Sequence, residues 1–170
     1  MDRDRAGYRR PMMRNLLTGV AAGAAGTTAL NLVTYLDMVA RARPASTTPE
    51  DTVRGAEKLT GATLSTDGPD SDEAANRRSG VGALLGIAAG LGTGAIYGAV
   101  RPRLGRVPLA VLGVGAGVVA NVGTTGPMAA FGITDPREWP AGSWVSDLVP
   151  HLAYGLATAA VWDLMQPRPS

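Results

Sequence analysis

The sequence has no cysteine and little aromatic content. Without cysteine the chain can form neither a disulfide nor a thiolate metal site. Its 170 residues include one Phe, four Tyr and three Trp against twenty-three Gly, so the large apolar side chains of an ordinary soluble core are scarce. Burial free energy grows with apolar area, by roughly 25 cal/mol per Å². Small side chains bury little area but let backbones approach closely, which favours a different kind of core.

Charged residues are missing from long stretches of the chain. Asp, Glu, Lys and Arg are absent from Asn15–Leu36, Ser79–Val100 and Val107–Thr134. A fourth stretch, Leu148–Trp162, contains His151 but none of these four residue types. A helix needs about 20 residues to cross a bilayer core about 30 Å thick. Three stretches reach that length, and the fourth does so if its helix begins near Trp144.

We therefore expect an all-α fold, a four-helix transmembrane bundle that forms one integral membrane domain over residues 1–170. The four helices are expected at about residues 15–40, 80–100, 108–132 and 144–165. The segment 41–79 would then be an outer loop. Within it, Thr48-Pro49-Glu50-Asp51 is typical of a helix start with Thr48 as the cap. A short extramembrane helix should follow to about Thr60 and end at Gly61. The acidic, turn-rich stretch Ser65–Glu73 is expected to be mobile.

Arginine marks one side of the predicted membrane. The N-terminal arm and the turn after the second helix contain Arg3, Arg5, Arg9, Arg10, Arg14, Arg101, Arg103 and Arg106. Because short cytoplasmic segments carry an excess of Lys and Arg, both termini are expected in the cytoplasm. A cleaved signal peptide is the weaker alternative, because the first apolar run is longer than the roughly 7–15 residues of a signal's apolar region.

Glycine recurs at every fourth position of the second predicted helix. The row consists of Gly82, Gly86, Gly90, Gly94 and Gly98. In water each interior glycine costs about 1 kcal/mol relative to alanine, so a soluble helix of this composition is implausible. In lipid the backbone hydrogen bonds enforce the helix, and small residues become contact surfaces. We expect this glycine zipper to pack on the first helix, at Gly19, Gly23 and Gly26. The alternative is a second copy of the same helix, which would make a homo-oligomer.

Two glycine patterns match the loose dinucleotide-binding signature GxGxxA, at Gly90–Ala95 and Gly115–Ala120. That signature needs a strand, a tight turn and a helix within a βαβ unit. Both matches lie instead inside charge-free stretches of membrane length, so we expect no cofactor. The net charge of +2 is modest and comes from arginines at helix ends, so we expect no nucleic-acid partner.

A set of polar residues falls in the outer half of the predicted membrane, where ionisable groups are costly and are candidates for function. These residues are Asn31, Asp37, Asn121, Asp147, His151 and Tyr154. The last three are four and three residues apart, so they share one helix face. An imidazole beside a carboxylate can accept and release a proton, which would suit a proton or small-solute pathway. The structural alternative is that Asp147 caps its helix and His151 bonds a neighbouring helix. Asp37 would then pair with Arg41.

The C-terminal part of the chain resembles a known family. The motif comprises Pro127-Met-Ala-Ala-Phe-Gly-Ile-Thr-Asp-Pro136, Trp139, Trp144 and Ser146-Asp147-Leu-Val-Pro-His151. It resembles the YagU-type family of small multi-pass bacterial inner-membrane proteins, in which a Trp-containing outer loop leads into a helix that begins Ser-acid-x-x-x-His. Here the acid is Asp147, where the family pattern has Glu. The resemblance covers about forty residues and implies location and architecture.

The sequence leaves two functions open. The first is a non-enzymatic integral membrane protein, a structural or accessory component that associates with itself or with a membrane-protein partner through its small-residue faces. The alternative is a proton-linked or small-solute permease that uses the polar residues of the outer half. We expect no catalytic or metal-binding residues, because there is one histidine, the carboxylates are scattered, and no Ser-His-Asp arrangement has a useful spacing.

Overall fold

The computed structural model describes residues 3–167, with side chains from Met12 onward. The described chain is helical throughout and contains no strand, which confirms the predicted all-α fold class. Its helices are α1 (Arg3–Arg41), α2 (Thr48–Thr60), α3 (Asp72–Val100), α4 (Leu109–Ala130) and α5 (Ala141–Leu164). Two short 3-10 turns, η1 (Arg101–Arg103) and η2 (Pro136–Glu138), lie in the connections. The side chains of four predicted cytoplasmic arginines, Arg3, Arg5, Arg9 and Arg10, fall outside the described part.

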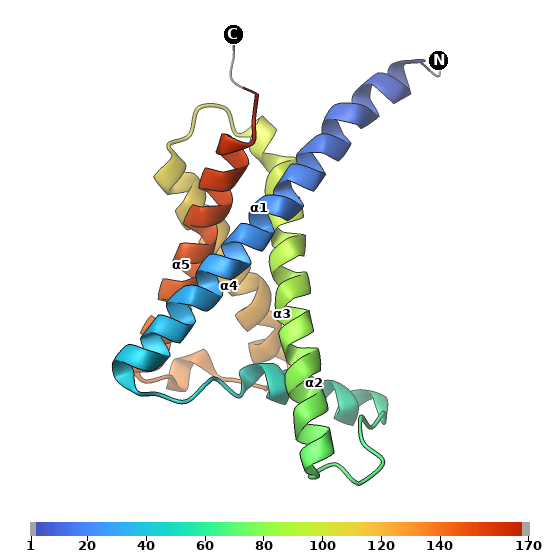
Figure 1. The fold of residues 1–170 in the computed structure, drawn as a ribbon, viewed down its shortest axis with the longest axis vertical. Helices are drawn as coiled ribbons and strands as arrows, with labels where there is room; N and C mark the ends of the chain where they lie inside the picture. Colours follow the sequence, from blue (N-terminus) through green and yellow to red (C-terminus); the bar gives the residue numbers. More distant parts are fainter. Residues whose placement is uncertain (1–2, 168–170) are drawn as a thin grey trace.

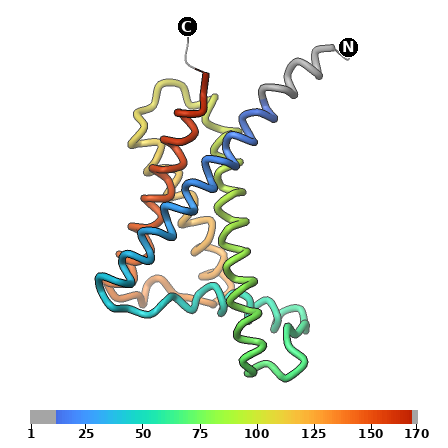
Figure 2. The backbone as a smooth tube through the Cα atoms, in the orientation of Figure 1, coloured from blue at the N-terminus to red at the C-terminus, as the bar shows by residue number. Residues whose placement is uncertain are grey.

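The four long helices form a bundle in which α1 is central (Figure 1). α1 packs against both α3 and α5, and α4 packs mainly against α5, so the spatial order is α3, α1, α5, α4. Figure 2 shows the N-terminal part of α1 that it colours, the C-terminal part of α5 and the α3–α4 turn at one end, which we call the terminal end. The short helix α2 and the turn of residues 61–71 lie at the other end and form what we call the cap.

Three helical stretches are long and apolar enough to cross a membrane: Met12–Arg41, Asp72–Arg103 and Leu109–Ala130. Only 28%, 17% and 28% of their apolar windows are buried inside the protein, so the rest of the bundle leaves most of each window uncovered. α5, with 24 residues, is long enough but is not among them. It carries Asp147, His151 and Asp163, which lower its apolar content. The predicted fourth span is therefore not established by length and composition.

Glycines on α1 and α3 bring these two helix backbones into direct contact. A methyl group added at Gly19 would lie 2.9 Å from the Cα of Gly98, and one at Gly23 would lie 2.9 Å from the Cα of Gly94. Such distances leave no room for any side chain. Gly90 faces the hydroxyl of Thr27, one turn further along α1.

The other members of the glycine row have different neighbours. A methyl group at Gly82 would meet the Cβ of Pro49 on α2 at 2.8 Å, whereas one at Gly86 would meet no atom within 4 Å. On α1, Gly26 does not face α3 as we expected. It packs on the ring of Tyr154 of α5. The row therefore contacts α1 through three of its five glycines, and another of them holds the cap.

A second glycine contact, not foreseen from the sequence, joins α4 to α5. A methyl group at Gly155 would lie 2.8 Å from the Cα of Gly117, and one at Gly113 would lie 2.9 Å from the Cα of Leu156. Gly117 belongs to one of the two GxGxxA matches, and both matches lie within continuous helix. In the second match Gly117 serves close helix packing, whereas Gly115 faces open space.

The cap begins where the sequence predicts a short helix. α2 spans Thr48–Thr60, and Gly61 ends it with φ 69°, in the left-handed region that favours glycine. The residue at the cap position is Thr47 rather than Thr48, and its side chain makes no capping hydrogen bond. Val53 is 4% exposed and faces the bundle. The predicted short helix is thus present, with its cap shifted by one residue.

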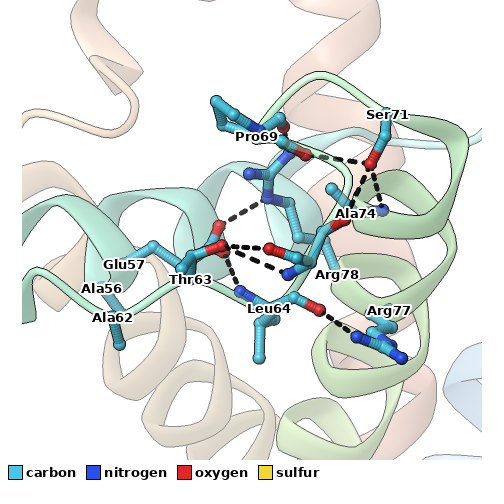
Figure 3. A network of polar contacts seen from close by, with 12 residues as sticks. Ala56, Glu57, Ala62, Thr63, Leu64, Pro69, Ser71, Ala74, Arg77 and Arg78 are labelled. Carbon is cyan, nitrogen blue, oxygen red and sulfur yellow. Dashed lines mark hydrogen bonds and ion pairs between the residues drawn. The ribbon is translucent and has the colours of Figure 1, made fainter.

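The turn between α2 and α3 is folded, although its acidic composition led us to expect a mobile segment (Figure 3). Ser65 is 7% exposed, and its hydroxyl donates to Glu73 at 2.7 Å. Ser71 caps α3 by accepting from the N–H of Ala74 at 3.2 Å. Asp72 and Glu73 occupy the first turn, where the helix dipole favours acids. These groups start α3 at Asp72, about two turns before the charge-free stretch begins.

Candidate functional site

Four polar side chains meet between α4 and α5, and we call Asn121, Thr124, Asp147 and His151 the polar cluster. The amide Nδ2 of Asn121 donates to the carboxylate of Asp147 and lies 3.3 Å from Nδ1 of His151. The side chains of Asp147 and His151 are 20% and 15% exposed. The cluster therefore links the two helices through a carboxylate, an amide and an imidazole that are mostly shielded.

The ring of His151 makes contacts at both nitrogens. Nδ1 lies 2.7 Å from the backbone carbonyl oxygen of Asp147 and 3.5 Å from its carboxylate, so this nitrogen carries the proton and donates. Nε2 lies 3.5 Å from the hydroxyl of Thr124. The ring therefore lies between Asp147 on its own helix and Thr124 on α4.

Helix spacing and glycine together assemble the polar cluster. Asp147 and His151 are one turn apart on α5, and Asn121 and Thr124 are three residues apart on α4, so each pair shares a face. The two faces approach because Gly117 lies against the backbone of His151: a methyl group there would be 3.2 Å from the His151 carbonyl carbon. The cluster is therefore a consequence of the α4–α5 glycine contact.

The order hydroxyl, imidazole, carboxylate in this cluster is that of a hydrolytic triad. In a hydrolytic triad the hydroxyl donates its hydrogen to the imidazole, and this contact is different here. The hydroxyl of Thr124 donates to the carbonyl oxygen of Ala120 at 3.0 Å, and its distance to the His151 ring is 3.5 Å. The hydroxyl hydrogen is directed to the helix backbone rather than to the imidazole, so the arrangement joins helices and does not activate a nucleophile.

Asp37 lies outside the polar cluster and forms a second polar contact between α1 and α5. Its carboxylate accepts from Nε of Arg41 and from Nε of Arg43, each at 2.5 Å. The hydroxyl of Ser146 lies 3.3 Å from the same carboxylate, and Arg41 also donates to the carbonyl oxygen of Gly142 at 3.3 Å. Consecutive residues Ser146 and Asp147 therefore bind different neighbours, α1 and α4.

The other two candidate residues do not join the polar cluster. Tyr154 is 1% exposed, and its hydroxyl donates to the carbonyl oxygen of Gly90 on α3 at 2.6 Å. Asn31 is exposed on α1, with no hydrogen bond to any described residue. The structure thus brings together three of the six candidates, Asn121, Asp147 and His151, and separates Asn31, Asp37 and Tyr154 from them.

Three partners of the candidate residues were missing from the sequence-based set: Thr124, Ser146 and Arg43. The sequence did contain a signal for two of them. Thr124 lies three residues after Asn121 on the same helix, and Ser146 directly precedes Asp147. Arg43 had none, because it follows the end of α1 and reaches Asp37 only through the path of the connection.

Two hollows in the surface of the described residues lie at the cap, away from the polar cluster, and their volumes are about 420 Å³ and about 300 Å³. The larger is lined by Glu57, Arg78 and neighbouring residues, and the smaller by Arg54, Phe131 and Ile133 among others. Within residues 3–167 no group of three or more His, Asp or Glu side chains could hold a metal ion.

Comparison of the chain with protein-family models, with curated proteins and with solved structures finds no match. The function must therefore be argued from the geometry of this molecule alone.

Proposed function

We propose that this chain is a multi-pass integral membrane protein without catalytic activity, a structural or accessory component of the bacterial plasma membrane. The observation that carries the proposal is that apolar side chains lie on the outside of the bundle and polar side chains lie between its helices. Apolar side chains such as Leu84, Ile96 and Val122 are 65%, 59% and 60% exposed, as lipid contact requires. The polar side chains Asn121, Asp147 and His151 instead bind one another across α4 and α5.

The same observation supports α5 as a fourth span. Intramembrane polar groups are tolerated when they face the bundle interior and find partners there. Ser146 binds α1, Asp147 and His151 bind α4, and Tyr154 binds α3, so α5 directs each of these groups to a neighbouring helix. The arginine distribution supports cytoplasmic termini, and the resemblance of residues 127–151 to the YagU-type family agrees with this location.

The alternative function, a proton-linked permease, has one observation in its favour: the polar cluster contains two titratable groups, Asp147 and His151, side by side on α5. A pathway also needs access for its solute. The two hollows described above lie at the cap and include no residue of the polar cluster. The geometry therefore supports a contact between helices better than a pathway.

Proton flux into liposomes separates the two functions. Purified protein is reconstituted with a pH-sensitive dye inside, and a potassium gradient with valinomycin drives proton movement. We expect no flux above that of empty liposomes, and we expect His151→Ala and Asp147→Asn to lower thermal stability in detergent. Asn31→Leu, at an exposed position, is the control for stability. Flux that is present in the natural protein and absent in His151→Ala would establish the permease instead.

A further inference from the structure

An arginine, a tryptophan and a tyrosine pack together at the terminal end, between α3 and α5. Trp162 is 5% exposed and Tyr97 is 9% exposed. Their rings meet edge to face, with centroids 6.2 Å apart and planes at 83°. The guanidinium carbon of Arg101 lies 5.5 Å from the centroid of the Trp162 ring, in cation–π geometry. We call these three residues the donor cluster.

Each member of the donor cluster has a buried polar atom without an acceptor. Nε of Arg101 and Nε1 of Trp162 make no hydrogen bond to any described residue, and the hydroxyl of Tyr97 has only the Arg101 guanidinium beside it. The two nitrogens can only donate, and the hydroxyl is able to donate as well. A fourth such atom, the hydroxyl of Thr158, faces Gly26 deeper in the bundle. Because buried polar groups are normally paired, the donor cluster lacks acceptors.

The charge around the donor cluster is positive. Arg103 and Arg106 are exposed in the same turn as Arg101. The acid next to them is Asp163, whose side chain is 38% exposed and whose carboxylate lies 3.5 Å from Nη2 of Arg101. The other terminal nitrogen of Arg101 donates to the carbonyl oxygen of Gly105 at 3.2 Å. One exposed carboxylate does not balance three guanidinium groups, so the turn attracts anions.

We infer that the donor cluster binds a phosphate group, with Arg101 as its main contact and an acidic phospholipid headgroup as the source. A phosphate provides several acceptor oxygens and negative charge together, which are the two things that the cluster lacks. Tryptophan and arginine at the ends of membrane helices lie at headgroup depth. Arg101, 17% exposed, is the accessible edge of the cluster, and its contact with Asp163 is long enough for a phosphate to replace it.

This inference deepens the proposed function and rests on it for the source of the phosphate. In a bilayer the terminal end meets lipid headgroups, whereas in water it would meet only free phosphate. Different experiments would disprove the membrane location and the phosphate site. If carbonate extraction of bacterial membranes releases the protein in soluble form, the proposed function is wrong, and binding of phosphate by the purified chain can still be measured.

The test is thermal unfolding of the full-length protein in a neutral detergent with three probes. We expect phosphatidylglycerol to raise Tm at concentrations at which phosphatidylcholine does not. A rise with inorganic phosphate alone would support the phosphate site and assign it to free phosphate instead of a headgroup. No rise with phosphatidylglycerol or phosphate overturns the inference. Equal rises with phosphatidylglycerol and phosphatidylcholine overturn it also, since the acidic headgroup would then have no role.

Two variants locate the site, and a third serves as the control. Arg101→Gln removes the cation and should weaken the apparent affinity for phosphatidylglycerol by about tenfold or more. Trp162→Phe keeps a ring but removes the N–H, so it should keep its helix content by circular dichroism and bind a few-fold more weakly. Arg137→Gln changes an arginine that is 89% exposed at the opposite end and should bind as the natural protein does. Unchanged affinity in both cluster variants, or an equal loss in Arg137→Gln, overturns the inference.

Discussion

Nε of Arg78 on α3 donates to the carboxylate of Glu57 on α2 at 2.5 Å, and this pair ties the cap to the bundle. Arg78 also donates to the carbonyl oxygen of Pro69 at 2.7 Å, and the N–H of Leu64 donates to Glu57 at 2.9 Å (Figure 3). The side chains of Arg78 and Glu57 are 4% and 11% exposed. Removal of either partner would leave the other shielded from water and without its counter-charge.

Acid should release the cap. The Arg78 guanidinium, with the Leu64 N–H as the second cause, holds the pKa of Glu57 below its ordinary value of 4.5. Because the pKa of Glu57 is lower in the docked cap than in the free chain, the ionised carboxylate stabilises the docked cap at every pH above the ordinary pKa. This stabilisation is lost as the pH falls through the lowered pKa. Hydrogen exchange of the α2 amides, corrected for the intrinsic rate, should therefore accelerate on acidification below about pH 4 relative to about pH 6.

The variant Glu57→Gln separates this pair from general acid effects. It should expose α2 to exchange already at neutral pH and should remove most of the further change with acid. Glu50→Gln, on the same helix, is the matched control and should behave as the natural protein does. Protection of α2 that is the same at both pH values in the natural protein would contradict this prediction.

Within the glycine row, Gly94→Ala should destabilise the bundle and Gly86→Ala should not. A methyl group at Gly94 would lie 2.5 Å from the Cα of Gly23, whereas one at Gly86 meets nothing within 4 Å. Overpacking of a tight contact costs about 1–3 kcal/mol, while alanine at an open helical glycine gains up to about 1 kcal/mol. Unfolding in detergent by increasing sodium dodecyl sulfate gives both values. If both variants lost the same free energy of unfolding, the glycine row would not stabilise the bundle through the α1–α3 contact.

Asn121→Leu should weaken the α4–α5 contact. The substitution removes the donor that binds the Asp147 carboxylate, so that a partly shielded charge loses a partner. Hydrogen bonds between membrane helices contribute about 0.6–2 kcal/mol, and an unpaired carboxylate places the expected loss at the upper end. Asn31→Leu is the control at an exposed site with the same change of side chain. Steric-trap or denaturant unfolding should show a loss for the first variant and none for the second.

Tyr154→Phe should loosen α3 from α5 with little change in packing. The ring, which fills the space against Gly26, is kept, and the hydrogen bond to the carbonyl oxygen of Gly90 is lost. We expect a loss of about 1 kcal/mol in the free energy of unfolding. Tyr35→Phe, at a position 61% exposed, should lose nothing. A larger loss at Tyr35 would mean that the exposed face of α1 has a partner.

Cysteine labelling tests the orientation, because the natural chain has no cysteine to interfere. Thr66 is exposed in the cap, and Leu104 is 43% exposed in the turn after α3. With cytoplasmic termini, Thr66→Cys should react with a membrane-impermeant maleimide on intact cells and Leu104→Cys should react only after lysis. The reverse pattern would invert the topology. Ser65 is unsuitable for this purpose, because its side chain is buried and hydrogen-bonded.

Where the sequence has a strong local signal, the fold could be predicted. The Thr-Pro-Glu-Asp start and the Gly61 stop predicted α2 to within one residue, because both signals act within a single turn of helix. The start of α3 was missed by about two turns, since absence of charge marks the membrane-length part of a helix and not its extramembrane part. Ser71, Asp72 and Glu73 held that information in their capping pattern.

Contacts between helices were harder to predict than the helices. Glycine spacing showed that α3 has a small face, but not that Gly82 would meet α2 while Gly86 met nothing. Spacing along α5 correctly grouped Asp147 with His151, but it also grouped them with Tyr154, which lies deeper and turns to α3. Matching small faces indicated that α1 packs on α3 at Gly19 and Gly23, but the neighbours of Gly26, Gly82 and Gly86 depend on how all the helices are ordered in space.

The central place of α1 has a consequence for the making of the protein. A chain is synthesised from its N-terminus, so α1 is made before both of its partners, α3 and α5. Until α3 is made, the glycine face of α1 has no partner helix. Assembly of this bundle therefore waits for α5, and a ribosome stalled before α5 would leave one side of α1 without its neighbour.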